Sequence, residues 1–345
     1  MGIGSNRPTR RLLRPFRVAA WWEHKLIPLA AVYYCVVVAH HASIAPHAAR
    51  LGQLLVAVVA GAASVSVLND ITDREEDALA GKTNAIAEAS MWLKVAALAT
   101  PTAVGVAMFA VWRHDPPVIA IYAASWLMFL LYSLPPVRLK RRGVVGVAAD
   151  AFGASLFPAL LAAVLASRAL RVPVDMWFII GVILWSGGYG GRGILLHQLA
   201  DRENDLRSGV PTFAVRHRPE MIAKLSRRVV FPLELAGLLI LLIRVASLAP
   251  LLALTVYLLL TWLRWHRWGR PVSLVRGDSD SRMTLQEYYN VFLPMALLTA
   301  SAWHRLGLVV VALHVVVFPL AVATTTGETF LLLTRACRKL PLIRT

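Results

Sequence analysis

Hydrophobic residues recur along almost the whole chain in runs long enough to cross a lipid bilayer, separated by short polar stretches. A helix rises about 1.5 Å per residue, so roughly 20 apolar residues span a hydrocarbon core of about 30 Å. The pattern predicts an all-α protein built from membrane-spanning helices. Ten segments qualify: 26–43, 51–68, 91–112, 117–133, 146–166, 176–196, 229–246, 248–265, 286–303 and 306–326.

The ninth segment is the weakest of the ten. Tyr288, Tyr289, Asn290 and Pro294 shorten its apolar run, so residues 286–303 could instead form a re-entrant or interfacial piece. We therefore expect a polytopic helical bundle of nine or ten transmembrane helices.

Composition supports this class. The chain has 345 residues, of which 58% are hydrophobic and 16% charged, whereas about a quarter of a soluble domain is charged. We expect one membrane domain over 26–333, between a basic segment 1–25 and a basic tail 334–345. With only Cys35 and Cys337, neither a disulfide framework nor a metal–thiolate site is credible.

The net charge of +17 follows mostly from topology. Lys and Arg near span ends hold loops on the cytoplasmic side, and 28 of the 36 fall in the two terminal segments and alternate loops. Ten spans with both termini inside fit this distribution best. We expect no nucleic-acid partner. Thirty Arg against six Lys hint at a GC-rich bacterial genome, so we expect an inner-membrane protein with its polar site facing the cytoplasm.

An acidic cluster follows the second segment, where the chain reads Asn69-Asp70-x-x-Asp73-x-x-x-Asp77. On one continuous helix, at about 100° per residue, the three aspartates project within an arc of about 60°. The pattern predicts three carboxylates on one helix face where the chain leaves the bilayer.

A second acidic cluster follows the sixth segment. Asp201 and Asp205 are one helical turn apart and share a face with His197, Gln198 and Asn204. Asp201 comes 131 residues after Asp70, and the second cluster repeats the first at an equivalent helix end.

Carboxylates this close need a cation between them, because each pair repels by about 4 kcal/mol at an effective dielectric near 20. Oxygen ligands select Mg²⁺ or Ca²⁺, and Mg²⁺ typically binds one or two carboxylates together with substrate phosphates. Two facing clusters would hold a phosphorylated substrate through Mg²⁺. The alternative is a pair of ordinary acidic helix ends, solvated and paired with neighbouring basic residues: Arg74, Lys82, Arg202 and Arg207.

A basic loop lies between the fourth and fifth segments. Pro135 and Pro136 predict an extended turn, in which Arg138 and Lys140 point the same way. These side chains could clamp phosphate oxygens that a metal leaves free. The loop could equally be only an orientation signal.

Two further features have two interpretations each. Asp150 is either a functional carboxylate or a cap near the start of the fifth segment. Five glycines in residues 187–193 either let helices approach closely, which we favour, or open the wall for a long ligand. We expect Arg192, within this run, to face a polar cavity.

Taken together, these motifs resemble the UbiA superfamily of intramembrane prenyltransferases. The resemblance rests on the two aspartate motifs and on Tyr132-Ser-x-Pro-Pro-x-Arg138-Leu-Lys140, followed by Gly146 and Asp150, and it covers roughly residues 10–300. It implies a bundle around a central lipid-accessible cavity. It also implies an isoprenyl diphosphate held through Mg²⁺, with prenyl transfer to a lipophilic, usually aromatic, acceptor within membrane lipid.

The resemblance also implies roles for individual residues. Asn69, Asp70, Asp73 and Asp77 would bind one Mg²⁺, and Asp201 and Asp205 the other. The leaving diphosphate would be neutralised by Lys82, Arg138 and Lys140. Further expected substrate contacts are Tyr132, Asp150, Arg192, His197 and Gln198.

The sequence departs from the family pattern after the first motif, where Gly81-Lys82-Thr83-Asn84-Ala85-Ile86 lacks the Arg-Pro pair of many members. The acceptor is therefore open, and two other functions stay possible. One is a membrane terpene cyclase that uses a prenyl diphosphate without an acceptor. The other is a non-catalytic transporter or lipid-binding protein.

Overall fold

The computed structural model describes residues 14–268, 272–273, 282–302 and 306–337. The ends of the two basic terminal segments, 1–13 and 338–345, lie outside these residues. Within them the chain is helical, apart from one parallel pair of two-residue strands, β1 (Val272–Ser273) and β2 (Arg282–Met283). The predicted all-α class is confirmed.

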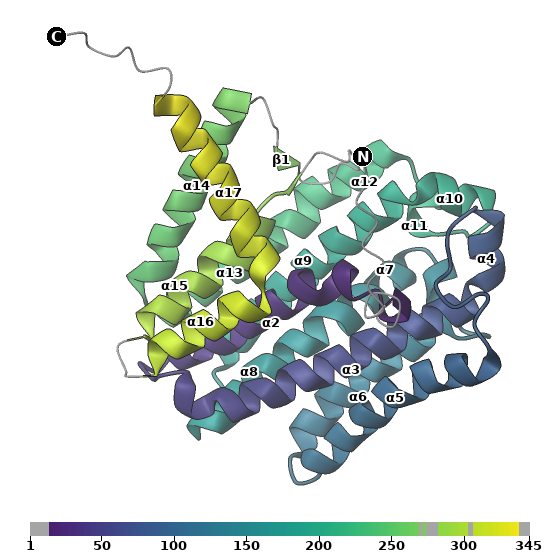
Figure 1. The fold of residues 1–345 in the computed structure, drawn as a ribbon, viewed down its shortest axis with the longest axis horizontal. Coiled ribbons are helices and arrows are strands. Elements are labelled where there is room, and N and C mark those ends of the chain that lie inside the picture. The colour runs from purple at the N-terminus through teal and green to yellow at the C-terminus, as the bar shows by residue number, and fades with distance from the viewer. Residues whose placement is uncertain (1–13, 269–271, 274–281, 303–305, 338–345) are drawn as a thin grey trace.

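Helices occupy the first five predicted segments (Figure 1). The elements are η1 (Arg14–Phe16), α2 (Val18–Ala39), η2 (Ala45–His47), α3 (Ala48–Thr72), α4 (Arg74–Leu79), α5 (Met91–Val111), α6 (Pro116–Ser133), η3 (Leu139–Arg141), α7 (Val144–Ala151), η4 (Phe152–Leu156) and α8 (Phe157–Leu170). The fifth predicted segment is helical throughout, because the π-helical turn η4 joins α7 to α8. The long helices pack as α3 with α5, α2 with α8 and α6 with α8.

The second half continues the bundle. Its elements are α9 (Met176–Ala200), α10 (Arg202–Arg207), α11 (Phe213–Arg216), α12 (Pro219–Leu225), η5 (Ser226–Val230), α13 (Phe231–Val245), α14 (Leu248–Trp268), η6 (Tyr288–Phe292), α15 (Leu293–Ala300), α16 (Gly307–Val317) and α17 (Pro319–Cys337). The weak ninth segment is thus helical, through η6 and α15.

The tenth segment is not one straight helix. α16 and α17 meet at an angle of 89°, with the break at Phe318, because Pro319 cannot continue the hydrogen bonding of the preceding helix. Among the described residues, six helices are long and apolar enough to cross a membrane, or seven with this bent pair. The expected count of nine or ten spans is not confirmed.

The glycine run in α9 lets that helix pack closely on α13. A Cβ on Gly188 would lie 2.7 Å from the Cβ of Glu234, and a Cβ on Gly237 would lie 2.1 Å from the backbone nitrogen of Trp185. Neither distance is sterically possible, so only glycine allows this approach. The packing interpretation of residues 187–193 is confirmed.

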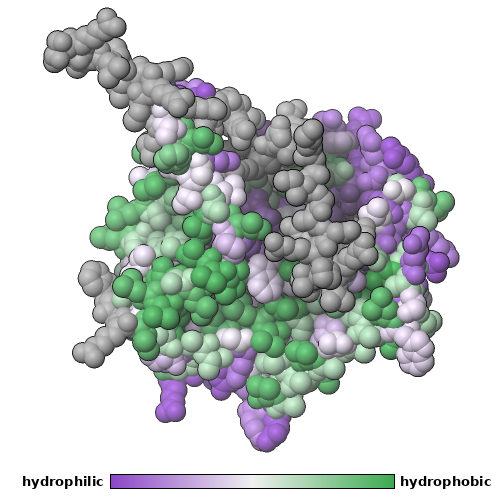
Figure 2. All heavy atoms as spheres, in the orientation of Figure 1, coloured by the Kyte–Doolittle hydropathy of each residue, from purple (hydrophilic) through white to green (hydrophobic). Residues whose placement is uncertain are grey.

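The bundle has one polar end. The short helices α4, α10 and α11 gather at the upper right of Figure 1, where three of the predicted cytoplasmic loops meet. Hydrophilic residues cover this end in Figure 2, and hydrophobic residues form a broad band below it. The surface is that of an integral membrane protein, with polar motifs at one rim.

Candidate active site

Each aspartate motif lies at a junction between a long helix and a six-residue helix. Asp73 separates α3 from α4, and its N–H donates to the Asn69 carbonyl at 2.8 Å. Asp201 separates α9 from α10 in the same way, and its N–H donates to the His197 carbonyl at 3.0 Å. The two sites are built by the same local fold.

This equivalence continues through both loops at an offset of 128 residues. Asn84 Nδ2 donates to Asp77 Oδ2 at 2.9 Å, and Thr212 Oγ donates to Asp205 Oδ2 at 3.0 Å. The short helices are followed by Gly81 and Gly209, whose φ angles of 68° and 69° favour glycine. The structural repeat therefore pairs Asp73 with Asp201, and the expected alignment of Asp70 with Asp201 is wrong.

Asp70 instead corresponds to Gln198. The Asp70 side chain is fully buried and forms an ion pair with Arg17, whereas Gln198 is buried and accepts a hydrogen bond from the Ala214 N–H at 3.3 Å. The prediction that Asp70 shares one helix face with Asp73 and Asp77 assumed a continuous helix. The helix is interrupted at Asp73, but i→i−4 hydrogen bonds continue through the junction, from the Asp73 N–H to the Asn69 carbonyl and from the Asp77 N–H to the Asp73 carbonyl. The shared face therefore stays a prediction, while Asp70 itself does not line the cavity described next.

Carboxylates from both motifs line a single cavity of about 630 Å³ at the polar end. Lys82 Nζ, from the loop after the first motif, donates to Asp201 Oδ2 of the second at 3.0 Å. The expected residues that line the cavity are Asn69, Asp73, Asp77, Lys82, Tyr132, Lys140, His197, Gln198, Asp201 and Asp205.

The cavity wall carries more negative than positive charge. Five carboxylates face three Lys or Arg side chains, which leaves two formal negative charges. Burial raises the pKa of the Asp205 carboxyl above its ordinary value, and the hydrogen bond from Thr212 opposes that shift. The wall is suited to binding a divalent cation.

The basic loop closes one side of this cavity. Arg138 lies 3.1 Å from Asp73 and 2.9 Å from Glu76, and Lys140 contacts the same two carboxylates. The predicted extended conformation is wrong, because residues 139–141 form the turn η3. Lys140 lines the cavity, whereas Arg138 supports Asp73 and Glu76 and is not part of the lining.

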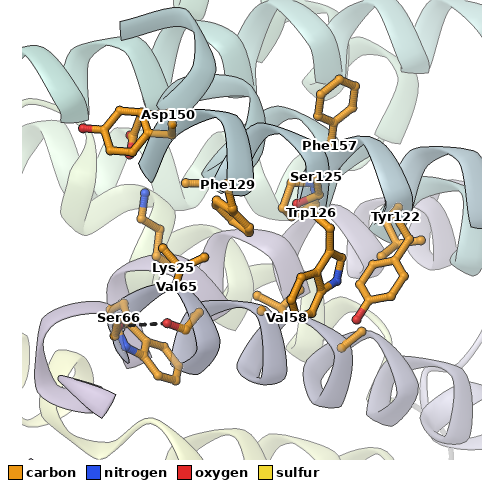
Figure 3. A pocket seen from close by; sticks show the side chains of 18 of the residues that line it. Lys25, Val58, Val65, Ser66, Tyr122, Ser125, Trp126, Phe129, Asp150 and Phe157 are labelled. Carbon is orange, nitrogen blue, oxygen red and sulfur yellow. Dashed lines mark hydrogen bonds between the residues drawn. The ribbon is translucent and has the colours of Figure 1, made fainter. Parts of the chain in front are cut away.

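An apolar cavity of about 180 Å³ adjoins the polar one, and Asn69 and Tyr132 line both. Its walls come mainly from α3, α6 and α8 and carry several aromatic side chains, among them Tyr122, Trp126 and Phe129. Figure 3 shows Lys25 and Asp150 at one end of this cavity and Tyr122 at the other. A polar chamber thus opens directly onto a hydrophobic one.

Asp150 faces the apolar cavity rather than capping a helix. It is the seventh residue of α7, which begins at Val144, so it is far from the helix N-terminus. Among the described residues it has no ion-pair partner within 4.0 Å, and the capping interpretation is wrong.

Arg192 does not face the polar cavity as expected. It is completely buried, and its guanidinium makes two 2.6 Å contacts with Glu234 and donates to the Thr284 carbonyl. Tyr289 also donates to Glu234, at 2.8 Å. The ion pair satisfies Arg192 inside the bundle and joins α9 to α13.

Sequence reasoning missed several residues of the site. Arg17 and Lys25 line the two cavities, but their positions in the N-terminal region gave no local signal. Asn84 and Thr212, which orient the aspartates, could have been found. The motif Asp-Arg-Glu-x-Asp-x-x-x-Gly occurs at 73–81 and again at 201–209, and these two residues follow it at the same distance.

Within the described ranges, no three His, Cys, Asp or Glu side chains lie close enough to hold a metal ion together. The carboxylates are instead paired with basic or amide groups, such as Lys82 and Asn84. A complete protein cage for a metal is therefore not formed, and further ligands would have to come from a substrate.

Comparison with known proteins places this site in context. The model of the UbiA prenyltransferase family matches residues 26–286. A UbiA homolog from Archaeoglobus fulgidus bound to GPP and Mg²⁺ is 18% identical, with a TM-score of 0.57 over 88% of this chain and 99% of its own. The same homolog bound to DMAPP and Mg²⁺ is 16% identical, with a TM-score of 0.57 over 85% and 100%. No curated protein matches by sequence.

Proposed function

Because the chain belongs to the UbiA prenyltransferase family, we propose that it ionises an isoprenyl diphosphate and transfers the prenyl group to a lipophilic, aromatic acceptor. The observation that carries this proposal is the junction of the two cavities at Asn69 and Tyr132. An isoprenyl diphosphate has a charged head group bonded directly to an apolar chain, so its binding site needs a polar cavity next to an apolar one.

The donor set fits Mg²⁺. Asn69, Asp73 and Asp77 from one motif and Asp201 and Asp205 from the other offer only oxygen ligands, and the lining is net negative. The absence of a three-residue protein cluster in the described chain also fits, because Mg²⁺ shares its shell with substrate phosphates. The solved homolog is described as bound to GPP and Mg²⁺. Mg²⁺ would withdraw negative charge from the diphosphate as it leaves.

Three protein groups are available to the diphosphate oxygens. Lys82 and Lys140 line the cavity and currently neutralise Asp201 and Asp73. With those carboxylates engaged as metal ligands, both ammonium groups would be free to bind phosphate oxygens. Gln198 is buried and its Nε2 has no partner among the described residues, so it offers a further donor.

The bond that breaks joins C1 of the prenyl chain to the diphosphate oxygen, which keeps the electron pair. The resulting allylic cation would lie in the apolar cavity, where the faces of Tyr132, Phe129 and Trp126 stabilise positive charge. The acceptor attacks C1 and loses a proton. Asp150 is the cavity carboxylate left to take that proton, since Asp73 is paired and Asp70 is buried.

The chain lies in the membrane with this site at the cytoplasmic rim, in our proposal. The three loops at the polar end, 69–90, 134–145 and 197–228, hold 13 of the 36 Lys and Arg residues, and the positive-inside rule favours the cytoplasmic side for such loops. A terpene cyclase on the same scaffold is the competing function. The missing Arg-Pro pair leaves it open, whereas the glycine run gives it no support, because that run serves helix packing rather than opening the wall.

The test is product analysis with purified protein and Mg²⁺. Geranyl, farnesyl or geranylgeranyl diphosphate is supplied with and without phenolic or quinone acceptors, and products are identified by mass spectrometry. We expect a prenylated acceptor only when the acceptor is present. A cyclic hydrocarbon or alcohol formed without an acceptor would instead establish cyclisation.

The matched variants are Asp201→Ala and Glu203→Ala, two residues apart. Asp201 lines the cavity, whereas Glu203 is 84% exposed and contacts only Arg207. We expect Asp201→Ala to lower pyrophosphate release by on the order of 100-fold and Glu203→Ala to leave it unchanged. Equal rates in both variants would remove the site assignment.

A further inference from the structure

A third cavity, of about 350 Å³, lies between α2, η6 and α17, on a different side of α2 from the two cavities above. Trp21 and Lys25 line the apolar cavity, whereas Trp22 and His24 line this one. Its α17 wall and Asn290 lie beyond residue 286, where the family match ends. Nothing in the proposed prenyl transfer uses it.

Most polar side chains of this cavity already have partners. Trp22 Nε1 donates to the Val317 carbonyl at 2.9 Å, and Glu23 accepts from the Leu320 and Ala321 N–H groups at 2.7 and 2.5 Å. Thr325 donates to Glu287 at 2.6 Å. These contacts hold the N-terminus of α17 against α2 and satisfy those groups without a ligand.

Asn290 is the exception. It is only 5% exposed, it lines the cavity, and its Oδ1 has no hydrogen-bond partner within the described part of the chain. A buried acceptor without a partner costs about 1–3 kcal/mol. It therefore indicates a ligand that donates a hydrogen bond at this point.

His24 supplies the complementary donor. Its Nδ1 lies 3.2 Å from Gln286 Nε2 and 3.4 Å from Asn290 Nδ2. Both amide groups donate, so Nδ1 accepts and the ring proton is on Nε2. Two residues that line the cavity therefore carry complementary groups, an acceptor on Asn290 and a donor on His24.

We propose that this cavity binds the uncharged hydroxyl group of an amphiphilic molecule. A hydroxyl both donates and accepts, so it matches Asn290 and His24 together, which a ketone or an ether does not. Trp22, Val291 and Leu320 provide an apolar wall for the rest of the molecule. The carboxylate of Glu23 disfavours an anionic head group here, whereas that of Glu287 is neutralised by Arg264 at 2.5 Å.

Photoaffinity labelling tests this proposal with the full chain in phosphatidylcholine nanodiscs. The probe is a 4-alkylphenol with a diazirine in its alkyl chain, and labelled peptides are mapped by mass spectrometry. We expect labelling of peptides from α2, η6 or α17. Competition by unlabelled nonylphenol or by diacylglycerol then distinguishes an aromatic compound from a lipid alcohol as the source of the hydroxyl.

Two variants remove the recognising atoms and one matched variant does not. Asn290→Leu and His24→Phe should each reduce labelling roughly tenfold, the equivalent of about 1.4 kcal/mol. Thr324→Val should keep it, because the Thr324 hydroxyl donates within its own helix to the Leu320 carbonyl. Mg²⁺-dependent pyrophosphate release reports folding and should be retained in all three.

Wild-type labelling in both Asn290→Leu and His24→Phe would overturn the proposal. So would equal labelling by a probe of the same length that lacks the hydroxyl. If Asn290→Leu fails to fold, labelling of His24→Phe alone tests the proposal, because His24 is exposed.

Discussion

Asp70 and Asp73 are three residues apart, yet they have opposite surroundings. Asp70 is fully buried against Arg17, and its structural counterpart in the second motif is the neutral Gln198. Asp73 lies at a helix junction and lines the polar cavity. We therefore propose metal binding for Asp73 and a structural role for Asp70.

We expect Asp73→Asn and Asp70→Asn to separate these roles. Asp73→Asn should raise the Mg²⁺ concentration needed for half-maximal pyrophosphate release and lower the maximal rate on the order of 100-fold. Asp70→Asn should leave the Mg²⁺ requirement unchanged and lower the free energy of unfolding by up to about 1 kcal/mol, since Arg17 is half exposed. A raised Mg²⁺ requirement in Asp70→Asn would place Asp70 among the metal ligands after all.

Lys82 joins the two motifs through Asp201 and is free to bind the diphosphate once that carboxylate is neutralised. Lys82→Met should therefore raise the KM for the prenyl diphosphate roughly tenfold, a loss of about 1.4 kcal/mol. Arg207→Met is the control, because Arg207 is 62% exposed and pairs only with Glu203 at 3.7 Å. Steady-state kinetics that give both variants the same KM would remove Lys82 from the site.

At the scale of single residues, the sequence located the two motifs but not their register. Residue types and spacing identify the aspartates, because hard oxygen ligands at helical spacing are a local pattern. The burial of Asp70 is not a local property, since its partner Arg17 lies 53 residues earlier in the chain. Periodicity therefore does not show that Asp70, unlike Asp73 and Asp77, lies outside the cavity lining.

The apolar pattern predicts where the helices lie in the sequence, but not which helices pack together. Hydrophobic runs located every long helix, because hydrocarbon requires internal backbone hydrogen bonding. The pattern carries no information about which helices touch, so it put Arg192 at a cavity when its partner is Glu234 of α13. Nor does it show that the start of α17 after the 89° bend is held to α2, where the Leu320 N–H donates to Glu23.

The contact between α9 and α13 gives a prediction for these elements. Gly237→Ala would force a Cβ to within 2.1 Å of the Trp185 nitrogen, so it should destabilise the protein by about 1–3 kcal/mol. Gly193→Ala, on α9 with nothing within 4 Å of the added Cβ, should be neutral or stabilise by up to about 1 kcal/mol. Thermal unfolding in detergent measures both, and similar melting temperatures would contradict the packing geometry.

On the scale of the whole molecule, the two motifs can share one substrate only if both lie on the same side of the membrane. Their short helices α4 and α10 lie together at one end of the bundle, and the turn between α5 and α6 lies at the other (Figure 1). Charge distribution predicts that the motif end is cytoplasmic.

Single cysteines test this topology in a background where Cys35 and Cys337 are replaced by Ser. Glu75→Cys and Glu203→Cys lie on exposed parts of α4 and α10, and Arg113→Cys lies at the opposite end. In intact cells, we expect a membrane-impermeant maleimide to label only Arg113→Cys, with all three labelled after lysis. Labelling of Glu75→Cys in intact cells would reverse the orientation.

The central claim is that both aspartate motifs act together on one Mg²⁺–diphosphate complex. Binding of geranyl S-thiolodiphosphate, which resists ionisation, can be measured by calorimetry with and without Mg²⁺. The wild type, Asp77→Asn and Asp205→Asn form the comparison, one variant from each motif. We predict tight binding only for the wild type with Mg²⁺, and a clear loss in each variant. Binding that is independent of Mg²⁺, or that survives in either variant, would contradict the account.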